Sequence, residues 1–463
     1  MGAADGYERV LAIAEDRARS FLEELPDRPV RESATVEELR RSLDGELPEA
    51  GEDPATVVEE LAEAAEPGLI ALSSPRYFGF VVGGAMPAAL GADWLATAWD
   101  QIGSLYVCGP SASVAEEVAG KWVLDLIGLP DSSGFGLTTG GTMANFAGIA
   151  AGRHAVLERS GWDVEARGLQ GAPEVRVFAG DHAHATIFVA LRMLGLGSER
   201  AISVGADDAG RMIPADLDAA LGRGDGPAIV CAQSGEVNTG CFDPFVELAE
   251  VCERHGAWLH VDGAVGLWAA ASPELRHLTE GIERADSWST DAHKWLNVPY
   301  DSGFIAVKEA AALRGAMGIS APYLTGAADA RDSYQYVPES SRRARGFALY
   351  AALRSLGRGG VAELVERTSR LARLMAEELD ANPSLELLNE VVINQVLVAI
   401  AGDRSGEATA AAIERVQDDG TCWLAGTTWR GRAAIRISVC NWRTSEDDIR
   451  RSAAAIRDAV RRG

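Results

Sequence analysis

Short apolar segments alternate with amphipathic segments through the middle of the chain, and this alternation constrains the fold more than any other feature. Strand-like segments are expected at residues 135–139, 174–179, 228–232, 258–261, 285–289 and 303–308. Helices are expected between them, beginning near Thr142, near Ala185 and at Pro244. Apolar strands that alternate with helices form a mostly parallel sheet covered on both faces. The sequence therefore predicts an α/β protein.

Polar or glycine-containing residues come directly after four of these strands. They are residues 139–142, residues 181–184, Asp262 and Lys294. The carboxyl ends of parallel strands meet at one edge of a sheet, and ligands bind there. The four segments therefore predict one ligand site at this edge.

Lys294 and Asp262 indicate the chemistry of that site. Taken alone, Lys294 could be a surface side chain that covers apolar residues, and Asp262 could be a cap at a strand end. A lysine that is buried without a partner loses much solvation energy, and use as a covalent nucleophile accounts for its position. Pyridoxal 5'-phosphate requires both residue types, because the lysine bonds to its aldehyde and a carboxylate keeps its ring nitrogen protonated. The pair therefore predicts pyridoxal 5'-phosphate as the cofactor.

Two longer stretches carry a family resemblance. Residues 260–264 read HVDGA, and residues 285–303 read ADSWSTDAHKWLNVPYDSG. They resemble the group II pyridoxal-phosphate-dependent amino-acid decarboxylases, which include aromatic amino-acid, glutamate and tyrosine decarboxylases. The similarity runs from about Ser73 to the C-terminus. It implies a fold-type I enzyme with a large domain on a mostly parallel sheet, a smaller C-terminal α+β domain, and a homodimeric assembly.

Three units are expected along the chain: an N-terminal helical segment at residues 1–72, a cofactor-binding large domain at 73–356, and a small domain at 357–463. In the first unit, Asp53 and Pro54 predict the start of a helix. The resemblance implies that this unit embraces the partner subunit, and packing within the chain is the alternative.

The segment that opens the large domain resembles the family's substrate entrance. This makes three aromatic residues, Tyr77, Phe78 and Phe80, candidates for the substrate pocket, with core packing as the alternative. A helix is expected next, at residues 113–129, where Ser113 and Glu116 have the spacing of a capping box.

The resemblance also implies a role for each residue of the cofactor site. Lys294 holds the cofactor, Asp262 faces its ring nitrogen, and His184 stacks on the ring and takes part in catalysis, with His182 as the rival histidine. A glycine turn that enters a helix presents backbone N–H groups to an anion, which suits the cofactor phosphate. The remaining cofactor-binding residues are expected to be Gly141 and Thr142 at the phosphate, Ala264 on the opposite ring face, Ser289 at the phosphate, and His293 at the phosphate or the substrate carboxylate.

Asp291 and Glu236 depart from the family pattern, as does Met143, where the family usually has an acidic residue. Asp291 stands where several relatives have asparagine near the phosphate, and a carboxylate there is expected to bond the backbone or His293 instead. Glu236 stands where relatives often have a threonine near the cofactor's phenolic oxygen. Asn238 and Thr239 are both candidates to replace that threonine, and the choice between them stays open.

Pyridoxal phosphate can weaken any of three bonds at the substrate's α-carbon, so the cofactor alone does not fix the reaction. The resemblance favours decarboxylation of an L-amino acid to the amine and carbon dioxide. Another pyridoxal phosphate activity (a carbon–carbon lyase, an aldolase or an aminotransferase) and a catalytically silent binding protein are the alternatives. Decarboxylation needs a proton donor for the carbanion, and the family uses a tyrosine on a mobile loop. The corresponding loop is residues 326–337, where Tyr334 is the expected donor and Tyr336 the alternative.

The composition argues against several other classes of function. The net charge is −25 with no long basic run, which disfavours nucleic acid and anionic membranes as partners. The sequence has no signal-peptide pattern and no apolar run that could cross a bilayer. Six scattered cysteines without CxxC spacing, and histidines without a ligand pattern, predict reduced thiols and no metal. We therefore expect a cytoplasmic enzyme whose substrate is a small molecule, an amino acid.

Overall fold

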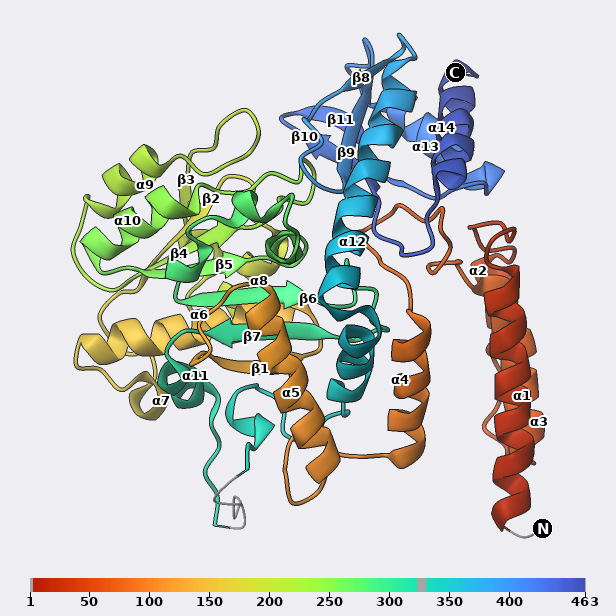
Figure 1. Ribbon diagram of the computed structural model, residues 1–463, viewed down its shortest axis with the longest axis horizontal. Helices are drawn as coiled ribbons and strands as arrows, with labels where there is room; N and C mark the ends of the chain where they lie inside the picture. Colours follow the sequence, from red (N-terminus) through yellow and green to blue (C-terminus); the bar gives the residue numbers. More distant parts are fainter. Residues whose placement is uncertain (1–2, 323–329, 463) are drawn as a thin grey trace.

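The computed structural model describes residues 3–322 and 330–462 and contains two β-sheets connected by a long helix (Figure 1). The large sheet consists of β1 (Gly134–Thr138), β2 (Arg176–Gly180), β3 (Ile202–Val204), β4 (Ala228–Gln233), β5 (Trp258–Asp262), β6 (Ser287–Asp291) and β7 (Gly303–Val307). Its strand order is β1-β7-β6-β5-β4-β2-β3. The prediction of an α/β fold with a mostly parallel large sheet and a smaller C-terminal domain is confirmed.

Strand direction in the large sheet follows the length of the connections. The neighbours from β6 through β5, β4 and β2 to β3 all pair in parallel, whereas β7 is antiparallel to both β6 and β1. A parallel crossover needs about a dozen residues or more, usually including a helix. Residues 292–302, which connect β6 to β7, contain no helix, so the chain turns back and β7 runs antiparallel. Lys294 lies in this connection.

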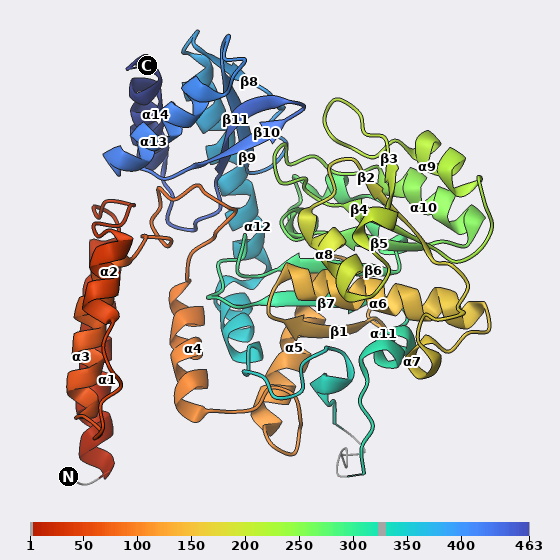
Figure 2. The same ribbon diagram turned by 180° about the vertical axis from the view of Figure 1, so that it is seen from behind.

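Both faces of the large sheet are buried, because successive residues of a strand point to opposite faces. On β4, Val230 and Ala232 join one hydrophobic core, and Ile229 and Cys231 join the other. Helices cover both faces, as the two opposite views show (Figures 1 and 2). The first core contains residues of α5 (Pro110–Leu126), α9 (Pro214–Leu221), α10 (Phe245–His255) and α12 (Gly346–Asp380). The second contains residues of α6 (Gly141–Arg159), α8 (Ala185–Met193) and α11 (Ala310–Met317).

The C-terminal part of the chain forms a separate antiparallel sheet with its own core. Its strands are β8 (Leu385–Leu387), β9 (Gln395–Ile400), β10 (Ala425–Trp429) and β11 (Arg432–Ser438), in the order β10-β11-β9-β8, and α13 (Glu407–Asp419) and α14 (Glu446–Arg461) pack against them. α12 joins both parts, and Gly357 interrupts its helical geometry with φ 62°. The domain division at residues 356 and 357 stays a prediction, and it falls at this interruption.

The N-terminal helices form a hairpin that stands beside the rest of the molecule (Figures 1 and 2). The segment contains α1 (Ala3–Glu24), α2 (Val36–Leu43) and α3 (Pro54–Ala65), and α4 (Pro87–Trp99) follows it. The predicted helix start at Asp53 is confirmed, since its carboxylate accepts the backbone N–H of Ala55 and Thr56. No helix in the described ranges is both long and apolar enough to cross a membrane.

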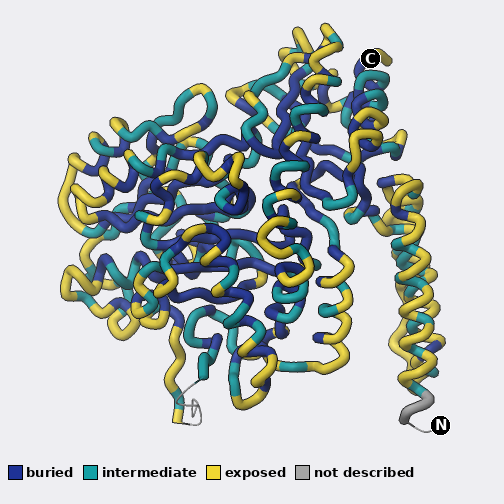
Figure 3. The backbone as a smooth tube through the Cα atoms, viewed as in Figure 1, coloured by how far each residue is buried: buried dark blue, intermediate teal, exposed yellow. Residues whose placement is uncertain are grey.

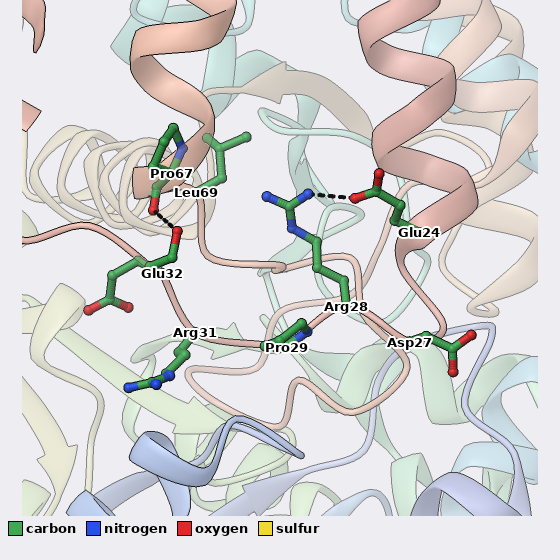
Figure 4. Close-up of a pocket in the computed structure, with 9 residues that line it drawn as sticks. Glu24, Asp27, Arg28, Pro29, Arg31, Glu32, Pro67 and Leu69 are labelled. Atoms are coloured by element: carbon green, nitrogen blue, oxygen red, sulfur yellow. Dashed lines mark hydrogen bonds and ion pairs between the residues drawn. The ribbon is translucent and has the colours of Figure 1, made fainter.

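A hollow of about 680 Å³ lies where the hairpin meets the body of the protein (Figure 4). Arg28 crosses it and binds Glu24 at 2.9 Å. Its lining comes from the turns around the hairpin and includes none of the predicted cofactor residues. The remaining helical segments are α7 (Val164–Arg167) and the 3₁₀ turns η1 (Glu66–Gly68), η2 (Ser198–Arg200), η3 (Gly266–Ala271), η4 (Arg276–Thr279), η5 (Ile282–Arg284) and η6 (Ser333–Gln335).

The predicted capping box at Ser113 is wrong. α5 begins earlier, at Pro110, because proline fits the first helical turn, and Ser113 therefore lies inside the helix. Glu116 is fully buried and binds Arg342 through both carboxylate oxygens, at 2.8 and 2.7 Å. Its partner lies far away in the sequence, so local spacing gave the wrong role.

Candidate active site

The ends of β5 and β6 bring the two residues of the predicted lysine–carboxylate pair to one edge of the large sheet. Asp262 is the last residue of β5 and pairs in register with Ser289 of β6. β6 ends at Asp291, and Lys294 follows in the turn toward β7. Hydrogen bonds through Thr186 and Asn145 connect His184 to Asp262, and the charges of Asp262 and Lys294 both act on the His184 imidazole.

Asp262 is buried, and each of its carboxylate oxygens has a protein donor. Oδ1 accepts the backbone N–H of Ala264 at 3.1 Å, and Oδ2 accepts Nδ2 of Asn145 at 2.9 Å. A carboxylate has about four acceptor positions, so lone pairs remain for a further donor. A protonated ring nitrogen is such a donor.

His184 caps the start of α8. Its Nδ1 accepts the backbone N–H of Thr186 at 3.3 Å and lies 2.8 Å from the Thr186 hydroxyl. Burial lowers the pKa of His184, and the nearby Asp262 charge opposes this shift. The rival histidine, His182, instead lies against the ring of Trp429, with 4.4 Å between centroids.

Asp291 lies between Lys294 and the glycine turn that begins α6. Its Oδ2 is 3.1 Å from Nζ of Lys294, while its Oδ1 is 3.7 Å from Nε2 of His293. A Cβ atom on Gly141 would come within 2.7 Å of Oδ2, so this position suits only glycine. Lys294 is thus the closer partner of Asp291, and the expected partner His293 lies within ion-pair distance of its other oxygen.

His293 is held in one orientation. Its Nδ1 accepts the backbone N–H of Ser302 at 3.0 Å, and its ring lies against Tyr300 with 4.3 Å between centroids. Burial lowers the pKa of His293. Nε2 is therefore the nitrogen that points toward Asp291.

The other predicted cofactor residues differ in how accessible they are. Thr142 and Ala264 are half-buried, in the first turn of α6 and just after β5. Ser289 is fully buried, and its hydroxyl donates to Oδ1 of Asn145. The structure thus brings Ser289 to Asn145, and its proposed contact with the phosphate stays a prediction.

Of the three aromatic pocket candidates, only Phe80 is exposed. Tyr77 and Phe78 are buried, whereas Phe80 is 61% exposed. The same segment continues over the lysine, since a Cβ atom on Gly83 would come within 2.0 Å of the Lys294 carbonyl oxygen. Core packing therefore describes Tyr77 and Phe78, and Phe80 stays a pocket candidate.

Sequence reasoning missed Arg436, which reaches the site from β11 of the small domain. Its charge contributes to lowering the pKa of His184, and its buried Nε has no hydrogen-bond partner in the described part of the chain. Burial lowers the pKa of Arg436, and the Glu236 carboxylate opposes this shift. No alternation along β11 marks Arg436, since its neighbours Ile435 and Ile437 are more buried than it is, and nothing in the sequence placed β11 beside the large sheet.

Glu236 is satisfied by its own turn. It accepts the backbone N–H groups of Asn238 and Thr239, at 2.8 and 2.7 Å, and Nδ2 of Asn238 at 2.7 Å. The hydroxyl of Thr239 points to the carbonyl of Ala209, at 2.9 Å. Glu236 thus holds this turn in shape, and the choice between Asn238 and Thr239 stays open.

The predicted proton-donor loop lies only partly within the described residues, since 326–329 fall outside them. Tyr334 is 3% exposed, and its backbone N–H donates to the carbonyl of Ser104. The hydroxyl of Tyr336 accepts a hydrogen bond from Arg314. This segment packs against β1, and β7 separates β1 from β6. The role of Tyr334 stays a prediction.

The arrangement fits pyridoxal phosphate. A lysine lies beside a glycine turn that begins a helix, where the Asp291 carboxylate lies against Gly141, and a buried carboxylate with free lone pairs lies at the next strand end. Within the described residues, no cluster of three or more histidine, cysteine, aspartate or glutamate side chains could hold a metal ion.

Comparison with known proteins identifies the family. A family model for the pyridoxal-dependent decarboxylase conserved domain matches residues 37–400. Tryptophan decarboxylase 1 of Oryza sativa subsp. japonica is 29% identical over 424 residues, covering 84% of this chain and 81% of that protein. Acidic amino acid decarboxylase GADL1 of Mus musculus is 32% identical over 330 residues, covering 69% of this chain and 59% of that protein.

The fold comparison agrees. The crystal structure of Oryza sativa TDC with PLP and tryptamine superposes with a TM-score of 0.92 at 25% identity, covering 100% of this chain and 99% of that chain. The family match extends over well more than half of the sequence. The chain belongs to the pyridoxal-dependent decarboxylase family.

Proposed function

We propose that this chain is a carboxy-lyase that decarboxylates an L-amino acid to the amine and carbon dioxide with pyridoxal 5'-phosphate as cofactor. The observation that carries the proposal is the position of Asp262 and Lys294 at neighbouring strand ends beside the glycine turn at Gly141. When bound, the cofactor withdraws electrons from the substrate's α-carbon. The protein selects which bond breaks by holding that bond perpendicular to the ring.

Each residue at the sheet edge has a proposed task. Lys294 bonds to the cofactor aldehyde, and Asp262 accepts the ring N–H through a remaining lone pair. His184, neutral because burial lowers its pKa, packs on the ring. Gly141 and Thr142 offer backbone N–H groups at the start of α6 to the phosphate.

Three further cofactor contacts complete the proposal. Ala264 is small enough to leave room for the ring face opposite His184. Nε2 of His293 approaches the phosphate or the substrate carboxylate from the Asp291 side. Ser289 supports this region from behind, through Asn145.

Arg436 is a candidate partner for a substrate carboxylate. Its side chain is half-buried, its Nε has no hydrogen-bond partner among the described residues, and a carboxylate is a ligand that a guanidinium binds well. Glu236 lies near enough to offset part of its charge. Activity on a panel of amino acids identifies which substrate carboxylate Arg436 binds.

A tyrosine of the 326–337 loop is the proposed proton donor, with Tyr334 first and Tyr336 second. Since Tyr334 is enclosed in its own chain, it can reach a substrate only if the loop changes position. Changing each of these tyrosines to phenylalanine and measuring carbon dioxide, amine and aldehyde identifies the donor, because a lost general acid lowers the rate about 10²- to 10⁴-fold.

A homodimer is the proposed assembly. The hairpin of α1 and α3 is exposed along its length (Figure 3), with apolar side chains such as Tyr7, 73% exposed, and Leu11 and Leu61 open to solvent. Trp94 and Trp99 are exposed on α4. An apolar surface of this kind fits a second copy of the chain. Light scattering that gives a monomer with full activity at micromolar concentration contradicts the dimer.

A cytoplasmic location is also proposed, and the six cysteines, all free thiols, support it. The test of the reaction is carbon dioxide release from a panel of aromatic, acidic and small amino acids, with Lys294→Ala as the control. Carbon dioxide and amine in equal amounts, absent with Lys294→Ala, support decarboxylation. Exchange of amino groups or cleavage of a carbon–carbon bond without carbon dioxide favours the alternative pyridoxal phosphate activities.

A further inference from the structure

The Asn145 side chain lies beneath the proposed cofactor site and uses every hydrogen-bonding position of its amide. It is fully buried in the first turns of α6. Oδ1 accepts Nε2 of His260 at 3.0 Å and the hydroxyl of Ser289. Nδ2 donates to Oδ2 of Asp262 at 2.9 Å and to the hydroxyl of Thr186 at 3.1 Å. One amide therefore joins α6, α8, β5 and β6.

The hydrogen bonds that Oδ1 accepts fix the orientation of the Asn145 amide. Burial lowers the pKa of His260 to about 4, so its imidazole is neutral and carries one hydrogen. The Trp258 indole donates to the Ser287 hydroxyl at 2.9 Å, and that hydroxyl is 2.8 Å from Nδ1 of His260. With Nδ1 as acceptor, the hydrogen lies on Nε2 and points to Oδ1 of Asn145. The opposite orientation of the amide would set its oxygen against the Asp262 carboxylate, which cannot donate.

The donor side of the amide reaches two residues of the cofactor site. One N–H holds the Asp262 carboxylate directly. The other N–H of the Asn145 amide donates to the hydroxyl oxygen of Thr186. The hydrogen of that hydroxyl can therefore point to Nδ1 of His184, which lies 2.8 Å from the oxygen. Since Nδ1 also accepts the Thr186 backbone N–H, a neutral His184 carries its hydrogen on Nε2.

We propose that Asn145 is a positioning residue that holds Asp262 and His184 together and, through Thr186, keeps the His184 hydrogen on Nε2. The inference rests on the proposed function, in which Asp262 meets the ring nitrogen and His184 the ring face. It adds that one residue, Asn145, holds both Asp262 and His184 in position. A displaced Asn145 would disturb the two contacts at once, whereas a change at Thr186 would disturb only His184.

Two variants separate the contact of Asn145 with Asp262 from its contact with His184 through Thr186. Thr186→Val removes the hydroxyl but keeps the shape and the backbone N–H, so we expect cofactor affinity to stay near that of the wild type while part of the His184 hydrogen moves from Nε2 to Nδ1. Asn145→Ala removes the hydrogen bonds to both Asp262 and Thr186. We expect pyridoxal phosphate to bind roughly 10- to 100-fold more weakly, as for a lost hydrogen bond to a charged group. Absorbance titration with pyridoxal phosphate measures the affinity. Nitrogen NMR of histidine side chains in the loaded protein, assigned with His184→Gln, reports the position of the hydrogen.

A control comes from Asn389, another side-chain amide that bonds to the main chain. It donates to the main-chain carbonyls of Thr239, Glu390 and Gln395 and accepts the backbone N–H of Leu397, and none of these hydrogen bonds reaches Asp262, His184 or Lys294. We expect Asn389→Ala to lower thermal stability and leave both readouts unchanged. If it changes them as much as Asn145→Ala does, general destabilisation explains the effect and the proposal is overturned.

Two further results would overturn the inference. One is wild-type affinity and an unchanged His184 spectrum in Asn145→Ala. The other is a His184 hydrogen on Nδ1 in the wild type, which the wild-type spectrum shows even if Asn145→Ala does not fold. A wild-type protein that binds no pyridoxal phosphate instead contradicts the proposed function, and the spectra of the cofactor-free wild type and Thr186→Val still decide the inference.

Discussion

His260 makes the stability of the protein sensitive to acid by an amount that can be calculated. Burial lowers its pKa from 6.5 to about 4, while the unfolded chain keeps the ordinary value. Between these two values the unfolded state binds a proton that the folded state lacks, so stability falls as the pH decreases. A difference of about 2.5 pKa units corresponds to about 3 kcal/mol, since one unit is about 1.4 kcal/mol. This stability is fully present above pH 6.5 and lost as the pH falls through about 4.

His260→Gln isolates this effect, because glutamine can still donate to Asn145 and accept from Ser287 without titrating. Urea unfolding of both proteins, in the same state of cofactor loading and followed by tryptophan fluorescence, gives the free energy of unfolding from pH 8 to pH 4. Other titrating groups contribute equally to both curves and cancel. We expect the advantage of the wild type to shrink by about 3 kcal/mol over this range. Parallel curves would refute the account of a neutral, buried His260.

Three other changes have expected outcomes. Asp291→Asn removes a negative charge beside the glycine turn proposed to bind the phosphate, so pyridoxal phosphate should bind at least ~10-fold more tightly in an absorbance titration. Weaker or unchanged binding would argue that Asp291 turns away from the phosphate. Glu116→Gln breaks a buried pair with Arg342, so the free energy of unfolding should fall by about 3–5 kcal/mol in urea titration; a loss under 1 kcal/mol would mean that water screens the pair. Arg436→Gln should raise KM for the amino acid while cofactor affinity stays constant, and an unchanged KM would remove Arg436 from substrate binding.

The parts of the site that follow from local sequence were predictable. Asp262 ends one strand and Lys294 follows the end of the next by three residues, and strand ends at one edge of a parallel sheet converge whatever the rest of the fold does. The glycine turn at Gly141 could be recognised for the same reason. The sheet, its mostly parallel pairing and the separate C-terminal part followed from the alternation of strands and helices.

The remaining features depend on contacts between distant segments. Asn145 is one polar residue in a helix, and its importance emerges only when β5, β6 and α8 surround it. Arg436 reaches the site from a second sheet, whose placement no local pattern specifies. Glu116 had the right spacing for a helix cap, but a partner more than two hundred residues away, Arg342, outweighs such a cap.

The most direct test of the account is to locate the covalent bond to the cofactor. The chain has three lysines, Lys121, Lys294 and Lys308, and the side chain of Lys121 is 62% exposed, which makes it an internal control for nonspecific reaction. The protein is loaded with pyridoxal phosphate, reduced with borohydride, digested and mapped by mass spectrometry. We predict a yellow protein before reduction and a pyridoxyl label on Lys294 alone, absent from Lys294→Ala. A protein that stays colourless with pyridoxal phosphate, or a label on Lys121 or Lys308 with Lys294 unmodified, would contradict it.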